Sequence, residues 1–145
     1  MGDLSKDINS KFANFKVKAL LNIIYTANWI SSRQSEAFKA YGISQQQYNV
    51  LRILRGANQP LKVQTIKDRM LERSPNATRL MDKLCAKHLI KRLPSEYDRR
   101  VVKIEITKQG LDLLDTIPSD LNKDLIENLS EAEAEQLSNL LDKMR

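Results

Sequence analysis

Apolar residues recur at steps of three and four along most of the chain, which is the spacing of one face of an α-helix. This pattern predicts four successive helices, over residues 4–38, 44–57, 63–72 and 74–87. No proline or glycine interrupts the first of them, so we expect it to be continuous. A small domain cannot cover the apolar face of so long a helix, so part of that face is expected to meet a second chain. The core-facing residues of the fourth helix are Ala77, Leu80, Met81 and Leu84.

Residues that favour the N-cap position stand where several helices are predicted to begin. They are Ser44, Ser74, Thr107 and Ser130. Pro75, directly after Ser74, suits the first turn of a helix. The pattern therefore predicts two further helices, one after Thr107 and one after Ser130.

The period of the apolar pattern changes from helix to strand after the fourth helix. Residues 89–93 and 101–106 are predicted strands, and the polar loop PSEYDRR joins them as a hairpin. Leu61 and Val63 flank another short extended piece before the third helix. The predicted fold class is therefore mainly α with a small β-hairpin.

The third and fourth helices are joined only by Arg73 and Ser74, a tight link that is typical of a helix-turn-helix. Ile66, Met70 and Leu71 of the third helix are expected to point inward. With the hairpin behind it as the wing, this order is that of a winged helix-turn-helix. Such a fold suits DNA, because the major groove admits one helix and its base edges carry a complete donor and acceptor code.

The charge of the chain is concentrated in its middle third. The formal net charge is +6, but residues 62–108 contain thirteen basic and six acidic residues, whereas the rest of the chain has a net charge of −1. A basic segment in an otherwise neutral chain indicates a polyanion site, although a solvated basic face gives the same count.

The candidate DNA contacts are polar residues of the fourth helix and of the wing loop. Arginine suits guanine, asparagine suits adenine, and short hydroxyls suit phosphates. An arginine at the wing tip can enter the minor groove, where negative potential is focused. We expect Asp98 to pair with a neighbouring arginine and to hold the tip in shape. The candidates are Ser74, Asn76, Thr78, Arg79, Lys83, Asp98, Arg99 and Arg100.

The segment DRRVVKIEITKQG, residues 98–110, resembles the wing signature of the multiple-antibiotic-resistance regulator (MarR) family. SPNATRLMDKL resembles the recognition helix of that family, and QQQYNVLRIL resembles the helix before its helix-turn-helix. The resemblance implies a twofold dimer that binds double-stranded DNA at a palindromic operator. It further implies a repressor of transcription that a small-molecule effector or an oxidant releases.

The resemblance also implies a domain layout. Residues 1–145 would form one domain, with 1–38 and 118–145 as dimerisation helices and 44–107 as the winged helix-turn-helix lobe that binds DNA. His88 departs from the family pattern, which has glycine there to accept a left-handed helix cap. Histidine tolerates that conformation at some cost.

Five aromatic residues are candidates to line a pocket for a small aromatic or apolar effector between the dimer helices and the DNA-binding lobe. Such pockets are mostly apolar. Core or interface packing is the commoner role for each of these side chains. They are Tyr25, Trp29, Phe38, Tyr41 and Tyr48.

Other functions find little support in the sequence. Cys85 and His88 are three residues apart, but the chain has no other Cys or His, so we expect neither a metal nor another cofactor. No catalytic motif indicates an enzyme. No long apolar stretch or export signal is present, and one cysteine fits a reducing compartment, so we expect a cytoplasmic protein that does not enter a membrane. The remaining alternative is a winged helix that binds protein or RNA.

Overall fold

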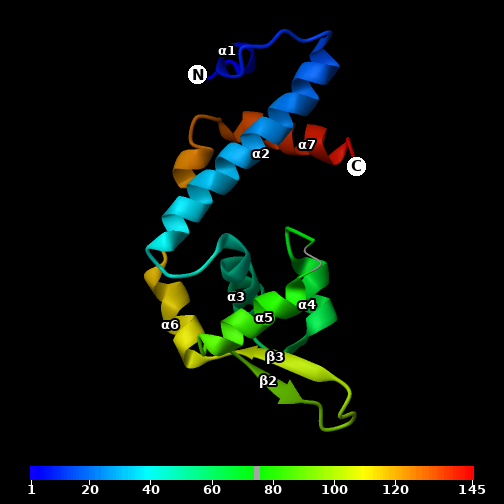
Figure 1. Ribbon diagram of the computed structural model, residues 1–145, viewed down its shortest axis with the longest axis vertical. Coiled ribbons are helices and arrows are strands. Elements are labelled where there is room, and N and C mark those ends of the chain that lie inside the picture. The colour runs from blue at the N-terminus through cyan, green and yellow to red at the C-terminus, as the bar shows by residue number, and fades with distance from the viewer. Residues whose placement is uncertain (74–75) are drawn as a thin grey trace. The chain divides into compact units, whose positions relative to one another are not determined.

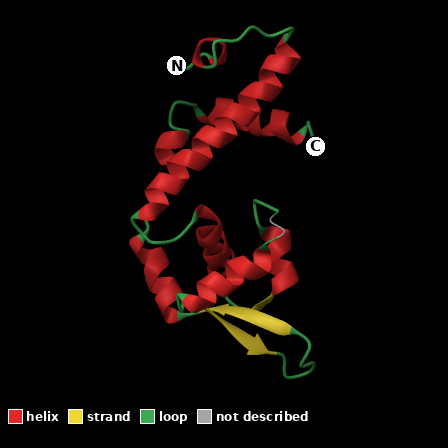
Figure 2. Ribbon diagram, viewed as in Figure 1, coloured by secondary structure: helices red, strands yellow, loops and turns green. Residues whose placement is uncertain are grey.

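The computed structural model describes residues 1–73 and 76–145 and is mainly helical with one small sheet (Figures 1 and 2). The helices are α1 (Leu4–Asp7), α2 (Phe15–Lys39), α3 (Gln45–Ala57), α4 (Val63–Arg69), α5 (Ala77–Ala86), α6 (Lys108–Thr116) and α7 (Glu131–Asp142), with a short 3₁₀ helix, η1 (Lys123–Leu125). The strands are β1 (Leu61–Lys62), β2 (Ile90–Pro94) and β3 (Val102–Ile106). The predicted fold class, mainly α with a β-hairpin wing, is confirmed.

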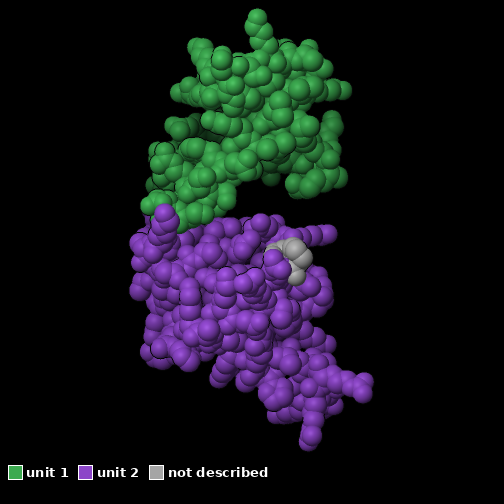
Figure 3. Space-filling model, in the orientation of Figure 1, with its two compact units in different colours: residues 1–37, 122–145 green, residues 38–121 purple. Residues whose placement is uncertain are grey.

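The chain divides into two compact units (Figure 3). One unit comprises residues 1–37 and 122–145, and the other comprises residues 38–121. In the first unit, all of which is described, Leu4 is the single buried residue. The hydrophobic core therefore lies in the second unit. No helix within the described ranges is long and apolar enough to cross a membrane.

The core of residues 38–121 forms where the apolar faces of α3, α4 and α5 meet the sheet. The four residues predicted to face inward from α5 are all buried, which confirms the helical pattern there. Ile66 of α4 and Ile104 of β3 are fully buried with them. The largest fully buried side chains are Phe38, Leu51, Leu54, Ile66, Met81, Leu84, Ile104 and Val50. This packing fixes the position of α5 within the unit.

The three strands form an antiparallel sheet in the order β1-β3-β2. Ile104 of β3 lies opposite Leu61 of β1 on one side and Arg92 of β2 on the other. Directly opposed residues share a face of a sheet, so Arg92 lies on the face that Ile104 directs into the core. The β2–β3 hairpin is the predicted wing and extends beyond the helices of its unit (Figure 1).

The predicted N-caps that the structure describes are confirmed. Ser44 and Ser130 each form a capping box with the residue three positions on, Gln47 and Glu133 respectively. The hydrogen bonds from Ser130 hold the pKa of the Glu133 carboxyl below its usual value. Thr107 accepts a hydrogen bond from the main-chain N–H of Gly110, 3.1 Å away.

The prediction of one continuous helix over residues 4–38 is wrong. α1 ends at Asp7, and Asn9 has a φ of 47°, in the left-handed region. The side chain of Asn14 then accepts a hydrogen bond from the N–H of Val17, 3.0 Å away, and α2 begins. Asparagine tolerates the left-handed region and competes for helix-end hydrogen bonds, so it interrupts a helix without proline or glycine.

The third helix is shorter than predicted. α4 ends at Arg69, because Met70 is extended and the N–H of Leu71 donates to the side-chain oxygen of Asn49 on α3, 3.1 Å away. The expectation that Leu71 points inward is wrong, since it is 82% exposed. α5 begins at Ala77 with Asn76 as its N-cap, so more than the two predicted residues separate α4 from α5.

Candidate nucleic-acid interface

The exposed face of α5 carries the polar residues expected there. Thr78, Arg79 and Lys83 are exposed, opposite the buried stripe of the helix. Asn76 is the N-cap of α5 and is also exposed, while Ser74 lies outside the described residues. A polar face on the second helix of a helix-turn-helix, free of core contacts, has the shape that a DNA groove accepts.

The wing tip is held by hydrogen bonds of Asp98. Its carboxylate accepts the main-chain N–H of Arg100 at 2.9 Å, and its carbonyl oxygen accepts the N–H of Val101 at 3.0 Å. Asp98 forms no ion pair with Arg99 or Arg100 in the described chain, so the expected side-chain pairing is wrong. Asp98 instead fixes the backbone of the turn and leaves both arginine side chains exposed.

An ion pair that the sequence analysis did not identify joins α5 to the wing. The guanidinium of Arg92 on β2 donates to the carboxylate of Asp82 on α5. This hydrogen bond raises the pKa of the Arg92 guanidinium. Sequence pattern could not reveal this pair, because it joins a helix to a strand and has no periodic spacing.

His88 has the left-handed conformation that the sequence analysis anticipated, with a φ of 58°. Its N–H donates to the carbonyl oxygen of Cys85 at 2.9 Å, and the N–H of Leu89 donates to that of Leu84 at 3.1 Å. These two bonds form a Schellman cap, with buried Leu84 and Leu89 providing its usual apolar pair. The chain therefore leaves the recognition helix by a defined turn into β2.

Lys87 ties the C-terminal end of α5 to α3. Its ammonium group donates to the carbonyl oxygen of Gly42, and it lies 3.4 Å from Oε1 of Gln47. Gln47 is 95% buried and also caps α3 by accepting the N–H of Ser44. The position of α5 is thus fixed by polar contacts at this end as well as by the core.

The five effector candidates fall in different parts of the chain. Tyr25 and Trp29 lie on α2 in the first unit, and each is 41% exposed. Phe38 is fully buried in the second unit and stacks on Tyr48, with ring centroids 4.7 Å apart. Tyr41 packs against the same core.

Cys85 is half-buried at the end of α5. In the part of the chain that the structure describes, no three His, Cys, Asp or Glu residues are grouped as metal ligands.

Comparison with known proteins identifies the family. The model of the MarR family matches residues 43–102, from before α3 to the start of β3. The HTH-type transcriptional regulator MhqR of Bacillus subtilis is 34% identical over 116 residues, 77% of this chain and 79% of its own. Among solved structures, the complex of S. aureus MepR with DNA has a TM-score of 0.75 at 26% identity and covers 92% of this chain and 97% of MepR.

A mutant MarR of E. coli complexed with operator DNA has a TM-score of 0.78. It covers 99% of each chain at 24% identity and supports the winged-helix fold. The matched family segment contains the helix-turn-helix and the wing tip, which are the elements that carry the exposed polar residues described above. The chain belongs to the MarR family of transcriptional regulators.

Proposed function

We propose that this protein is a sequence-specific regulator of transcription that binds double-stranded DNA with α5 and the wing. The observation that carries the proposal is a set of exposed cations on these two elements: Arg79, Lys83, Arg99 and Arg100. None of their side chains has an ion-pair partner in the described chain. Unpaired cations on a helix and a hairpin loop suit a polyanion, and two relatives of the same fold were solved with DNA.

The candidate residues divide into those that read bases and those that bind the backbone. Arg79 and Asn76 on the exposed face of α5 suit guanine and adenine in the major groove. Lys83 suits a phosphate, as do the hydroxyls of Ser74 and Thr78.

Asp98, Arg99 and Arg100 belong to the wing in this proposal. Arg100 enters the minor groove, where negative potential attracts arginine. Asp98 positions the backbone of Arg100 through its 2.9 Å hydrogen bond.

We further propose a homodimer formed by residues 1–38 and 118–145, with residues 44–107 as the DNA-binding lobe. In the first unit, large apolar side chains on α2 and α7 are exposed and have no core to cover them. Such an apolar surface on a small unit marks a protein interface. The exposed residues are Phe15, Val17, Leu20, Leu21, Ile24, Tyr25, Trp29, Leu137 and Leu140, with Met144 just after α7. A twofold dimer presents two copies of α5, which suits a palindromic operator.

Repression and effector release complete the proposal. A dimer seated on its operator blocks access to that DNA, and a small apolar or aromatic effector would release it. Tyr25 and Trp29 support this part, because both are amphipathic and half-exposed on α2. Phe38, Tyr41 and Tyr48 are the other candidates for effector binding in this proposal.

The experiment is recovery of bound fragments from a library of genomic duplex DNA, followed by titration of the enriched sequence. Tight, salt-dependent binding to a palindrome, with weak binding to a scrambled duplex and to RNA of the same sequence, supports the proposal. Equal affinity for RNA and for all duplexes would favour the alternative, a winged helix that binds RNA. No binding to any nucleic acid would favour a protein-binding module.

A further inference from the structure

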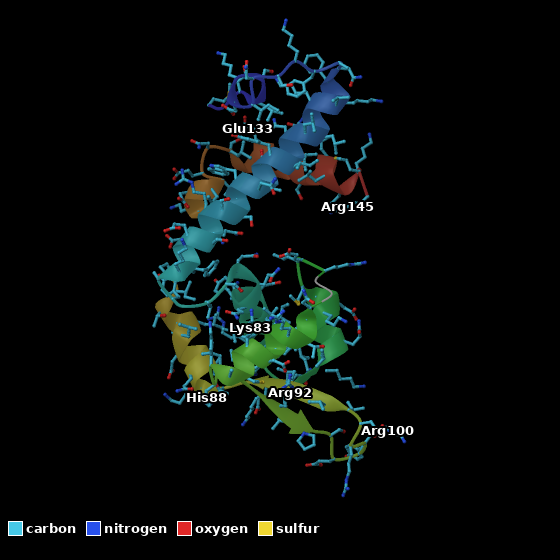
Figure 4. The ribbon with its side chains drawn as sticks, viewed as in Figure 1. Lys83, His88, Arg92, Arg100, Glu133 and Arg145 are labelled. Carbon is cyan, nitrogen blue, oxygen red and sulfur yellow. The ribbon has the colours of Figure 1, made fainter. Side chains whose placement is uncertain are left out.

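The ion pair between Asp82 and Arg92 joins α5 to the strand that leads into the wing loop. Asp82 is exposed on α5, one residue before Lys83, and Arg92 is in β2, whose strand leads into the wing loop. In Figure 4, Arg92 lies at the sheet between Lys83 of α5 and Arg100 of the wing. The pair therefore bridges the two elements that are proposed to enter DNA.

The guanidinium of Arg92 carries more N–H donors than its ion pair with Asp82 uses. Arginine carries five N–H donors in a planar fork, and within the described chain the Arg92 side chain makes its hydrogen bond to Asp82 alone. The side chain of Arg92 is 41% exposed, and that of Asp82 is 57% exposed. Arg92 is thus held at one edge of its fork, while the rest of the fork is open to a second acceptor.

The geometry of duplex DNA indicates which group would be the second acceptor for the Arg92 guanidinium. A helix in the major groove and a wing in the adjacent minor groove lie on either side of one sugar–phosphate strand. A side chain between the helix and the base of the wing faces that strand. Phosphate oxygens are the acceptors there, and the arginine fork matches phosphate geometry.

We propose that Arg92 is a phosphate-binding residue for the strand between the two grooves, and that Asp82 is the positioning residue that orients its guanidinium. The inference rests on the proposed function, since it requires α5 and the wing to bind duplex DNA. It assigns a DNA-binding role to an acidic residue of the recognition helix.

The two possible roles of Asp82 predict opposite effects of Asp82→Ala on DNA affinity. If Asp82 acts only through its charge, Asp82→Ala removes an anion from a DNA-facing surface and tightens binding. If Asp82 orients Arg92, Asp82→Ala weakens binding even though the net charge becomes more positive. Arg92→Ala removes the phosphate contact itself, with a loss of roughly tenfold per half-site, the size of one charge-assisted hydrogen bond.

The experiment is a double-mutant cycle on the enriched duplex, with Asp82→Ala, Arg92→Ala and the double variant titrated at several salt concentrations. We expect both single variants to weaken binding and the double variant to bind no more weakly than Arg92→Ala. The slope of log K against log salt should flatten by roughly 2 per dimer for Arg92→Ala, because each protomer loses about one phosphate contact. Arg92→Lys, which keeps the charge but not the fork, should retain most of the slope and recover only part of the affinity.

A matched control exists on the opposite face of the same hairpin. Glu105 of β3 forms an ion pair with Lys91 of β2, with Nζ and Oε2 2.9 Å apart. Like Asp82→Ala, Glu105→Ala removes one carboxylate that is ion-paired to a β2 cation, but it leaves the pair of Arg92 with Asp82 intact, so binding should tighten slightly or stay unchanged. Circular dichroism and thermal unfolding of each variant confirm that it is folded.

Tighter binding by Asp82→Ala, or additive losses in the double variant, would overturn the proposal. So would an unchanged affinity and slope for Arg92→Ala while the wild-type protein binds the enriched duplex. Failure of the wild-type protein to bind any duplex would contradict the proposed function instead, so the two failures are distinguishable.

Discussion

The hydroxyl of Thr107 donates a hydrogen bond to the main-chain carbonyl oxygen of His88 at 2.6 Å. The same hydroxyl accepts the N–H of Gly110 at 3.1 Å, and the main-chain N–H of Thr107 donates to the carbonyl oxygen of Leu89 at 3.0 Å. One residue therefore joins the end of the recognition helix, the start of β2 and the start of α6. This junction fixes the base of the wing relative to α5.

Gly110→Ala should destabilise the fold. An added Cβ would lie within 3.0 Å of the Leu89 carbonyl oxygen, a backbone atom that cannot move without breaking the junction. The expected cost is about 1–3 kcal/mol, as for overpacking in a core, measured by urea unfolding. Gly56→Ala is the control, because a Cβ at Gly56 in α3 meets nothing within 4 Å and should stabilise by about 0.5–1 kcal/mol. Equal stability of the two variants would contradict this account of the junction.

His88→Gly should stabilise the protein. His88 holds a φ of 58° to complete the cap of α5, and glycine adopts that conformation without the steric cost that a Cβ brings. The gain should be about 1 kcal/mol, visible as a higher thermal midpoint. His88→Val should lower the midpoint, because a β-branched residue is strained there. A lower midpoint for His88→Gly would show that the histidine side chain makes a compensating contribution.

Arg100→Ala should weaken DNA binding and leave folding unchanged. Its side chain is exposed, and only its main-chain N–H takes part in the turn, so substitution removes a cation without disturbing the hydrogen bond to Asp98. The salt slope should flatten by roughly 2 per dimer, and the loss should be larger for duplexes with A·T-rich flanks. Asp98→Ala should also weaken binding, because the turn loses its hydrogen bond. Tighter binding by Asp98→Ala would mean that its charge matters more than the turn.

Leu140→Glu should weaken the dimer. Leu140 on α7 is 55% exposed in the single chain, so a carboxylate there would be desolvated in the proposed interface. Sedimentation at micromolar concentration should show more monomer than for the wild-type protein. Ser138→Glu adds the same charge to an exposed position on the same helix and should leave the dimer intact. If the wild-type protein sediments as a stable monomer at this concentration, the proposed dimer is contradicted.

Features set by local chemistry could be predicted from the sequence. The buried stripe of α5, the N-caps at Ser44 and Ser130, and the left-handed position of His88 each depend on residues close together in the chain. The hairpin follows from alternation and from a polar loop between its strands. These patterns were sufficient for the winged-helix fold and for the exposed cations of the interface.

Features set by contacts between distant residues could not be predicted. α4 ends early because Asn49, on another helix, accepts the N–H of Leu71. Arg92 pairs with Asp82 because sheet register places it on the inner face, opposite Ile104. The break after α1 was missed for a different reason, since the left-handed conformation of Asn9 is a local preference that a search for proline and glycine overlooks.

The central claim is that the exposed face of α5 reads DNA sequence, and Arg79→Ala tests it most directly. Wild-type and variant proteins are titrated against the enriched duplex and against a scrambled duplex of the same length and composition. If Arg79 reads a base, the variant loses about 1–3 kcal/mol per half-site on the enriched duplex and much less on the scrambled one. Lys83→Ala, the comparison for a phosphate contact, should weaken both duplexes to a similar extent. Equal losses from Arg79→Ala on the two duplexes would contradict the claim that α5 reads sequence through Arg79.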